Sequence, residues 1–391
     1  MNIVLNIEEF LPQDNTTGAL AARVWRPELG GPSVVAIRDD QIYDISINFA
    51  TMRDLCEADD PASALRQCVG EYICKLTDLL ANTPTDDRDN TKPWLLSPAD
   101  LQCIKAAGVT FPISMLERVI DEKSRGNANE AAKFRLEINA LVGGDLSKLQ
   151  PGSEQAMALK EILIARDSWS QYLEVAIGPD AEIFTKAPVM ATVGTGFDAG
   201  VHPASEWNNP EPEVVLTINS KGKVIGATLG NDVNLRDIEG RSALLLGKAK
   251  DNNASATMGP FIRFFDHTYS IEDLKSCTVT LNVTGDDGFS MDGLSSMAQI
   301  SRDPLTLAAD LVSPHHQYPD GAMLYLGTMF APVKDRDKVG SGFTHKDNDI
   351  VKIYTPKLGT LVNRVRPTDK CDPWVFSCSH LMKNLAKRNL L

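Results

Sequence analysis

A segment near the middle of the chain places acidic side chains where a divalent cation could bind. Residues 209–232 predict a strand, a tight turn and a second strand. Glu211 and Glu213 are two residues apart, so their side chains leave the same face of an extended chain. The proline between them removes one ladder hydrogen bond, which the start of a strand can spare.

The predicted turn decides whether a third carboxylate joins this pair. If residues 221–222 form a two-residue loop, Ser220 pairs with Lys223. The same register puts Asp232 opposite Glu211, and Cβ atoms of such opposite residues stand about 5 Å apart. Three carboxylates would then share one face, and a divalent cation would offset their mutual repulsion and desolvation.

The kinds of side chain in these two strand segments restrict the cation. They contain neither histidine nor cysteine, so the ligands would all be oxygens, which favour Mg²⁺, or Mn²⁺ or Ca²⁺, over zinc. A second interpretation needs no cation, because acidic residues beside prolines commonly cap a strand and stay exposed. The Glu-Pro-Glu pattern alone is typical of exposed acidic residues that cap a strand, and only the hairpin register favours the metal site.

The first quarter of the chain predicts a small α+β unit. Residues 1–82 alternate short apolar segments with one helical stretch, and residues 83–93 are rich in Pro, Asp and Asn, which disfavour helix and strand. We therefore expect an N-terminal α+β domain over residues 1–95 and a larger domain with the metal site over residues 96–391.

Within the larger domain, helical spacing comes before strand spacing. Residues 115–173 predict a helical hairpin broken near residue 151, with Ser153 as the N-cap of the second helix. Residues 172–366 carry short apolar runs separated by turn residues, which predict a mainly β region. The sequence therefore indicates an α+β fold with an inserted helical hairpin.

Charge and composition exclude several classes of partner. The 391 residues carry a net charge of -13, which repels a phosphate backbone, and no apolar run reaches the length of about 18 residues that a membrane helix needs. The first residues lack the cationic region of a secretory signal, and the seven cysteines form no CxxC pair. We expect a cytoplasmic protein that binds neither nucleic acid nor membrane.

Several motifs together resemble the fumarylacetoacetate hydrolase superfamily. The Glu-Pro-Glu strand start is followed by Gly-Asn-Asp at residues 230–232, and Lys250 stands nine residues before Gly259. Further matches are Phe184-x-Lys186-x-Pro188, Gly194-x-Gly196, Gly327-Thr328 and residues 357–363. The resemblance covers roughly residues 100–366. It implies a mixed β-roll with a metal at its mouth, a separate N-terminal domain and a homo-oligomer, either a dimer or a tetramer.

Longer stretches resemble bacterial 2-keto-3-deoxy-pentonate dehydratases of D-xylose degradation. These stretches are residues 106–111, 169–179, 248–253 and 316–321. The resemblance implies a magnesium-dependent lyase that dehydrates the small sugar acid 2-keto-3-deoxy-D-xylonate (2-dehydro-3-deoxy-D-pentonate) to 2-oxoglutarate semialdehyde, through an enolate that the metal stabilises.

The resemblance also implies roles for individual residues. By position, Glu211, Glu213 and Asp232 correspond to the metal ligands of the family and Lys250 to its active-site lysine. Glu117 corresponds to its active-site glutamate. We expect Lys250 to carry the C3 proton and Glu117 to protonate the departing hydroxyl. Residues expected to contact the substrate are Ser114, Lys186, Arg236, Glu239 and Thr328.

Other interpretations remain open at this stage. Ser114 stands where hydrolases of the family carry a histidine, and serine alone cannot activate water, which argues against a metal-dependent hydrolase or decarboxylase of acylpyruvates. A non-catalytic metal-binding protein would explain the carboxylates but not Lys250 and Glu117. Without the motif spacing, Lys250 would be a solvated lysine or a partner of Asp232, and Glu117 a helix-face carboxylate.

Overall fold

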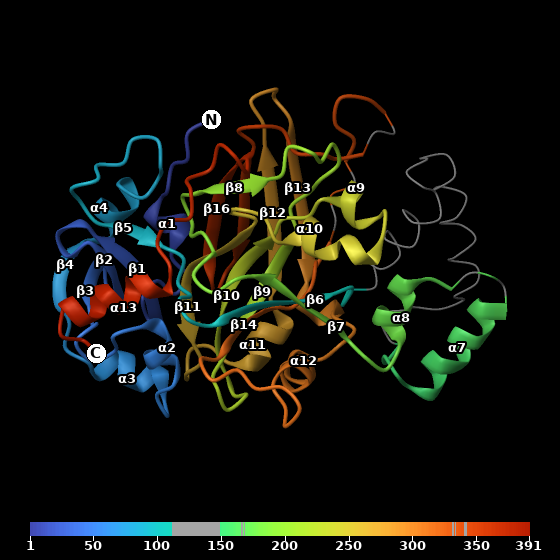
Figure 1. The fold of residues 1–391 in the computed structure, drawn as a ribbon, viewed down its shortest axis with the longest axis horizontal. Coiled ribbons are helices and arrows are strands. Elements are labelled where there is room, and N and C mark those ends of the chain that lie inside the picture. Colours follow the sequence, from blue (N-terminus) through green and yellow to red (C-terminus); the bar gives the residue numbers. More distant parts are fainter. Residues whose placement is uncertain (112–148, 166, 168, 331, 333, 340–341) are drawn as a thin grey trace.

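The computed structural model describes residues 1–111, 149–165, 167, 169–330, 332, 334–339 and 342–391. Two β-sheets form its body (Figure 1). In spatial order, the larger sheet contains β4 (Glu71–Lys75), β3 (Gln41–Asp44), β2 (Gly31–Arg38), β1 (Ala19–Arg26), β11 (Ala256–Phe264), β10 (Val224–Asp232), β9 (Pro212–Ile218), β14 (Ala322–Tyr325), β6 (Cys103–Gly108) and β7 (Glu182–Ala187). A further strand, β5 (Trp94–Leu96), pairs with β1. The smaller sheet contains β13 (Ser290–Ser296), β12 (Thr278–Thr284), β15 (Ile350–Thr355), β16 (Gly359–Pro367) and β8 (Asp198–Val201).

Short helices surround the sheets. In chain order, the α-helices are α1 (Ile7–Phe10), α2 (Met52–Cys56), α3 (Pro61–Gln67), α4 (Leu76–Ala81), α7 (Glu154–Ala165), α8 (Gln171–Ile177), α9 (Arg236–Glu239), α10 (Leu246–Lys250), α11 (Ile271–Ser276), α12 (Pro304–Leu311) and α13 (Cys378–Lys387). Single 3₁₀ turns span Pro27–Leu29, Ala243–Leu245 and Met297–Gln299. Within the described ranges, none of these helices has the length and apolarity to cross a bilayer.

The N-terminal strands continue the sheet that carries the carboxylates. β1 pairs antiparallel with β11, for example Ala21 with Ile262, so one sheet runs through both halves of the sequence. The C-terminal helix α13 lies against the N-terminal strands (Figure 1), where the Asn384 amide donates to the Leu29 carbonyl. Residues 1–95 and 96–391 therefore share one sheet, and their division into two domains stays a prediction.

The main core lies between the two sheets. Both faces of β9 are buried, so the sequence of this strand is a nearly continuous apolar run. Val214 and Leu216 of β9 pack with Leu281 of β12 and Ile353 of β15. The alternate residue Val215 belongs to a second core on the opposite face of the large sheet. Because side chains alternate along a strand, Glu213 shares its face with Val215 and points away from the smaller sheet. The sheet therefore presents the acidic side chains outside the main core.

The turn between β9 and β10 differs from the prediction. The Asn219 amide donates to the Lys223 carbonyl over 3.0 Å, so the loop has three residues and Ser220 does not pair with Lys223. The Asn219 side-chain oxygen accepts from the backbone amides of residues 221 and 223, and Gly222 takes the left-handed conformation with φ +78°. These local hydrogen bonds favour the longer loop, and the predicted two-residue loop was wrong.

A bulge restores the predicted register before it reaches the carboxylates. The pairing shifts by one residue between Val224 and Gly226, and from there Glu213 pairs with Gly230. At the far end of the hairpin the Asp232 amide donates to the Glu211 carbonyl over 3.0 Å. The predicted pairing of Glu211 with Asp232 is therefore confirmed, although the turn that should have set it is different.

Gly230 leaves the space that Tyr325 needs beside Glu213. A Cβ atom at this position would lie 2.3 Å from the Tyr325 ring and 2.7 Å from Val215. We expect Gly230→Ala to lower the free energy of unfolding by about 2 kcal/mol, because neither neighbour can move freely. Gly247→Ala is the control, since a Cβ there meets no atom within 4 Å. Denaturant unfolding of both variants would measure the difference, and equal stabilities would contradict the packing argument.

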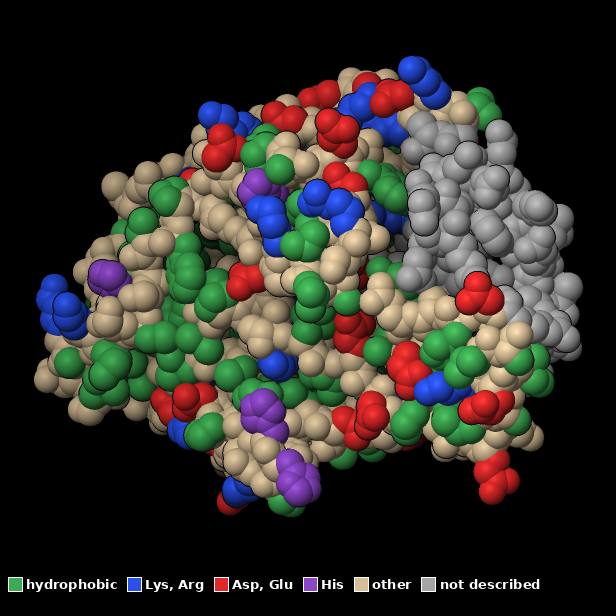
Figure 2. All heavy atoms as spheres, turned by 45° about the vertical axis from the view of Figure 1, so that its right-hand side comes forward, with side chains coloured by type: hydrophobic (Ala, Val, Ile, Leu, Met, Phe, Trp, Pro, Cys, Tyr) green, Lys and Arg blue, Asp and Glu red, His purple; other side chains and the backbone are tan. Residues whose placement is uncertain are grey.

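Described residues of the inserted segment form the two helices α7 and α8, which lie at the β7 end of the molecule (Figure 1). The Ala156 amide donates to the Ser153 hydroxyl over 3.2 Å, so Ser153 caps α7 as predicted. The first half of the predicted hairpin lies outside the described residues. On the face that Figure 2 shows, the coloured acidic and basic side chains are interspersed.

Candidate metal centre

Three carboxylates from the β9–β10 hairpin lie together in the interior. Glu211, Glu213 and Asp232 are 1%, 1% and 2% exposed, and one carboxylate oxygen from each lies within 4.8 Å of the others. Glu211 and Glu213 stand at the start of β9 and Asp232 at the end of the neighbouring β10. The interpretation as exposed strand caps was therefore wrong, because the carboxylates are buried and converge.

Backbone and amide hydrogen bonds hold Glu211 and Glu213 in place. The Asn231 side-chain oxygen accepts from the Glu211 amide over 2.8 Å, which fixes the chain just before the strand begins. The Asn234 amide group donates to a Glu211 carboxylate oxygen over 3.0 Å. On the other side of the cluster, the Gly327 amide donates to the Glu213 carboxylate over 2.7 Å. The bonds from Asn234 and Gly327 orient acidic oxygens before any cation binds, and the bond to Asn231 fixes the backbone of Glu211.

Two buried lysines contact the same carboxylates. The Lys250 ammonium donates to Glu211 and, over 3.0 Å, to Asp232, and its side chain is 3% exposed. The Lys186 ammonium lies 2.8 Å from the second Asp232 oxygen and is fully buried. It also donates to the backbone carbonyl oxygens of Val233 and Lys250. Both lysines thus belong to the acidic cluster.

Lys186 is placed differently from the expectation that it contacts substrate. Its ammonium is enclosed by Asp232, by the two carbonyl groups and by the Ser255 hydroxyl at 3.3 Å. Burial lowers the pKa of Lys186 more than the Asp232 charge raises it. In this structure Lys186 supports Asp232 and the backbone of Lys250, and its contact with a substrate stays a prediction.

The cluster contains more carboxylates than ammonium groups, which favours the binding of a cation. Three carboxylates face two ammonium groups, which leaves one excess buried negative charge. Burial, and then the charges of Asp232 and Glu211, raise the pKa of Glu213 well above its usual value. Although burial alone would raise the pKa of Asp232, the charges of Lys186 and Lys250 and their hydrogen bonds lower it. An all-oxygen site in which carboxylates outnumber ammonium groups fits a hard divalent ion, which would favour the ionised form of Glu213.

Three of the expected substrate-contacting residues lie around the cluster. The Thr328 hydroxyl is 3.5 Å from the Glu213 carboxylate. Glu239 is 9% exposed and accepts from the Asn234 amide group over 2.6 Å, so one side chain separates it from Glu211. The guanidinium of Arg236, the first residue of α9, lies 4.2 Å from the centre of the Trp207 ring in a cation–π contact. The structure therefore brings Thr328 and Glu239 to the cluster, and places Arg236 on the same short helix as Glu239.

Two other expected residues, Ser114 and Glu117, lie outside the described residues. The sequence analysis did not identify Asn231, Asn234 or the Gly327 amide as parts of the site. The two asparagines stand within the motif that follows the glycine at position 230, which was the available signal. The Gly327 contact joins residues 114 positions apart and gave no local signal.

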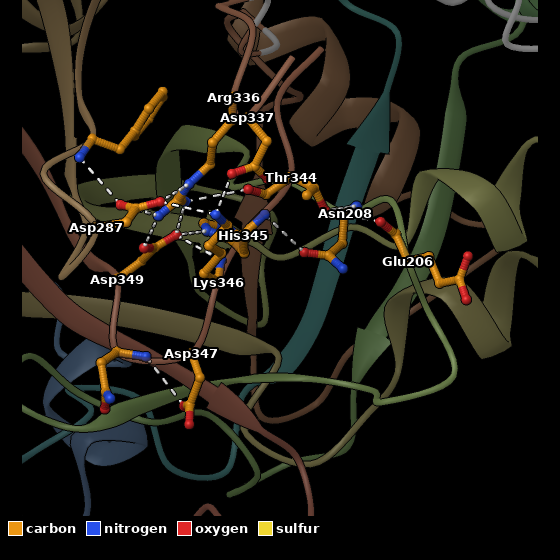
Figure 3. Close-up of polar contacts among 12 residues, drawn as sticks. Glu206, Asn208, Asp287, Arg336, Asp337, Thr344, His345, Lys346, Asp347 and Asp349 are labelled. Carbon is orange, nitrogen blue, oxygen red and sulfur yellow. Dashed lines mark hydrogen bonds and ion pairs between the residues drawn. The ribbon is translucent and has the colours of Figure 1, made fainter. Parts of the chain in front are cut away.

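A buried ionic network supports the chain segment that leads to Glu211 (Figure 3). The Arg336 guanidinium donates two hydrogen bonds to Asp349, of 2.6 and 2.8 Å, and two more to Asp287. Next to it, the His345 amide donates to the Asn208 side chain over 3.3 Å, and the Asn208 amide donates to the Thr344 hydroxyl. Asn208 is three residues before Glu211. The network therefore fixes the approach of the chain to the first carboxylate.

A small cavity adjoins the cluster on the side of α8. Its volume is about 110 Å³, and Tyr172 and Val175 of α8, Glu182 of β7 and Glu239 of α9 line it. Because Glu239 is linked through Asn234 to Glu211, the cavity begins one side chain away from the carboxylates. The cavity therefore lies beside the cluster and is linked to it through the hydrogen bonds of Asn234.

The sequence of this region matches a known family. Residues 191–366 match the family described as fumarylacetoacetate (FAA) hydrolase C-terminal, and they include the three carboxylates and Lys250. This region of the chain therefore belongs to the fumarylacetoacetate hydrolase family. The predicted recognition is thus confirmed, and so is the predicted fold class, an α+β chain with mixed sheets of the fumarylacetoacetate hydrolase type.

Two relatives of the chain carry dehydratase names. A 2-dehydro-3-deoxy-D-arabinonate dehydratase of Saccharolobus solfataricus is 31% identical over 48% of this chain, and the match spans 60% of that relative's length. A probable 2-keto-3-deoxyxylonate dehydratase of Haloferax volcanii is 26% identical over 86% of this chain and 96% of its own.

Solved structures show the same fold. A 2-keto-3-deoxy-D-arabinonate dehydratase complexed with magnesium and 2,5-dioxopentanoate is 23% identical and covers 89% of this chain and 99% of its own, with a TM-score of 0.62. A 5-carboxymethyl-2-hydroxymuconate delta-isomerase from Mycobacterium smegmatis is 16% identical, covers 89% of this chain and 98% of its own, and has a TM-score of 0.54. At these identities the likeness establishes the fold and not the reaction.

Proposed function

We propose that this protein is a divalent-metal-dependent hydro-lyase that converts 2-keto-3-deoxy-D-xylonate to 2-oxoglutarate semialdehyde. The observation that carries the proposal is the buried cluster of Glu211, Glu213 and Asp232 with the Lys250 ammonium against two of its members. The names of two relatives and of a magnesium-containing neighbour support the substrate class. The proposal includes Mg²⁺ as the cation and a homo-oligomeric protein.

The three carboxylates would hold the cation, which when bound supplies Lewis-acid polarisation of the C1 carboxylate and C2 carbonyl of the substrate. The hydrogen bonds from Asn234 and Gly327 keep Glu211 and Glu213 oriented toward that position. The Lys186 ammonium, 2.8 Å from an Asp232 oxygen, holds the third carboxylate. The preformed arrangement means that little reorganisation is needed when substrate binds.

In this proposal Lys250 moves the proton at C3. Its ammonium donates to Glu211 and Asp232, two of the carboxylates that would hold the cation. As the neutral amine, it would accept the C3 proton, and the electron pair of the C3–H bond would then expel the C4 hydroxyl. Proton donation to that hydroxyl releases one water, and Glu117 remains the predicted donor.

The product of elimination must still be converted to an aldehyde. Loss of water leaves a C3–C4 double bond conjugated to the C2 ketone. Transfer of a proton from C5 to solvent water and return of a proton to C3 give an enol at C4–C5. Protonation of C4 and loss of the enol hydroxyl proton then give the aldehyde of 2-oxoglutarate semialdehyde. Lys250, protonated in the first step, can return the proton to C3, so one residue serves both steps.

Removal of the divalent ion is expected to abolish turnover of the sugar acid. The protein would be incubated with 2-keto-3-deoxy-D-xylonate, and separately with an acylpyruvate, with Mg²⁺ and with an excess of chelator. Formation of 2-oxoglutarate semialdehyde from the first compound, only when Mg²⁺ is present, is the expected result. Cleavage of the acylpyruvate instead would favour the hydrolase, and turnover that survives chelation would contradict the metal-dependent mechanism.

A further inference from the structure

The adjacent residues Ser301 and Arg302 contact the main chain on both sides of the segment inserted between β6 and β7. Arg302 is 6% exposed, and its guanidinium donates to the backbone carbonyl oxygens of Val175, Gly178 and Asp180 over 2.9, 2.8 and 3.1 Å. The last carbonyl groups of a helix have no partner within it. Arg302 therefore caps the C-terminal end of α8, because its planar guanidinium offers several hydrogen-bond donors.

Ser301 contacts the other side of the insertion. Its backbone amide and its hydroxyl both donate to the Thr110 carbonyl oxygen over 2.8 Å. The Thr110 hydroxyl in turn donates to the Leu326 carbonyl oxygen over 2.5 Å, and the next residue, Gly327, donates to Glu213. A continuous series of hydrogen bonds thus leads from Ser301 to one of the three carboxylates.

Arg302 is connected to the cavity beside the same cluster. Val175, whose carbonyl oxygen accepts from Arg302, lines the cavity of about 110 Å³ together with Tyr172 and Glu239. The dipeptide Ser301–Arg302 is therefore linked both to α8, which forms one wall of the cavity, and to the carboxylate of Glu213. The distance between the wall and the cluster depends on Ser301 and Arg302, although neither residue lines the cavity.

We propose that Arg302 is a positioning residue that sets the α8 wall of the cavity relative to the carboxylate cluster and thereby determines the binding of the substrate beyond C3. This inference rests on the proposed function, because the substrate is taken to extend from the cluster into the cavity. The part of a 2-oxo acid that lies at the cluster, its C1 carboxylate and C2 carbonyl, does not depend on Arg302.

The test compares a short ligand with a longer one in the Arg302→Met variant. Oxalate occupies only the cluster, whereas 2-oxoglutarate has five carbons and no hydroxyl to eliminate. With Mg²⁺ present, the variant should bind 2-oxoglutarate about tenfold more weakly and oxalate with unchanged affinity. The KM for the sugar acid should rise by a similar factor, with a smaller change in kcat. Arg302→Lys should restore part of the effect, because an ammonium group can still reach some of the carbonyl groups.

Arg38 provides a matched control. Its guanidinium also closes a helix, donating to the backbone carbonyl oxygens of Leu65 and Cys68 at the end of α3, both over 2.7 Å. Arg38→Met should lower stability without changing the affinity ratio of the two ligands. Hydrogen exchange should show faster exchange at α8 only in Arg302→Met, which separates local displacement from general loss of stability.

The outcomes separate this inference from the proposed function. An unchanged affinity ratio in Arg302→Met, or the same change in Arg38→Met, would overturn the positioning role. If wild-type protein fails to dehydrate the sugar acid but the ratio changes as expected, the proposed function is wrong and the positioning role stands for another 2-oxo acid. Faster exchange at α8 without a changed ratio would show that Arg302 stabilises the helix only.

Discussion

Glu213→Gln is expected to lose at least about a hundredfold in Mg²⁺-supported turnover while the metal-free protein stays folded. Burial and the neighbouring carboxylates raise the pKa of Glu213, which favours the protonated carboxyl group when no cation is bound. Glutamine has the shape of that protonated form and can still accept from the Gly327 amide. A neutral amide, however, gives up the negative charge that a divalent ion requires.

Two measurements check this prediction together. In thermal unfolding, Mg²⁺ should stabilise wild-type protein, by about 2.7 kcal/mol at a concentration one hundred times the dissociation constant, and should stabilise Glu213→Gln far less. Without Mg²⁺ the two proteins should differ by about 1 kcal/mol or less. Glu272→Gln on α11, with its side chain 78% exposed, is the control and should behave as wild type. A Glu213→Gln variant with full Mg²⁺-supported turnover would remove Glu213 from the metal ligands.

Lys250→Met is expected to lower kcat by about 10²- to 10⁴-fold, because methionine fills most of the space of the lysine side chain and cannot carry a proton. The metal-free variant should also be less stable by about 3 kcal/mol, since Glu211 and Asp232 lose a buried cationic partner. Mg²⁺ should restore that stability, and it should bind at least as tightly as in wild-type protein because no ammonium competes for the carboxylates. Lost turnover with retained metal binding distinguishes Lys250 from a ligand.

A partial reaction tests the role of Lys250 directly. In heavy water, wild-type protein with Mg²⁺ should exchange the C3 protons of 2-oxoglutarate for deuterium, which nuclear magnetic resonance can follow, and Lys250→Met should not. Lys248→Met is the matched control, because Lys248 lies on the same short helix and its side chain is exposed. Exchange at the wild-type rate in Lys250→Met would assign the C3 proton to a different residue.

The carboxylate cluster could be predicted from the sequence because its geometry is local. Glu211, Glu213 and Asp232 lie within 22 residues, and the alternation of side chains along two paired strands places them on one face. The turn was harder to predict than the strands it joins. The Asn219 side chain and the left-handed Gly222 favour a three-residue loop, and a bulge at residues 224–226 then compensates for the extra residue.

The lysine pairing, the raised pKa of Glu213 and the support of α8 were decided only by the tertiary structure. Lys186 reaches Asp232 across 46 residues, and Arg302 reaches α8 across more than 120. Whether a buried ammonium contacts a carboxylate or a substrate depends on which strands and helices enclose it, and no pattern of side-chain types records that. The sequence by itself determined which acidic groups meet, because the alternation of side chains along the strands sets the hairpin locally. Packing between distant segments decided which of those charges are balanced by lysines, and therefore how the site can bind a cation.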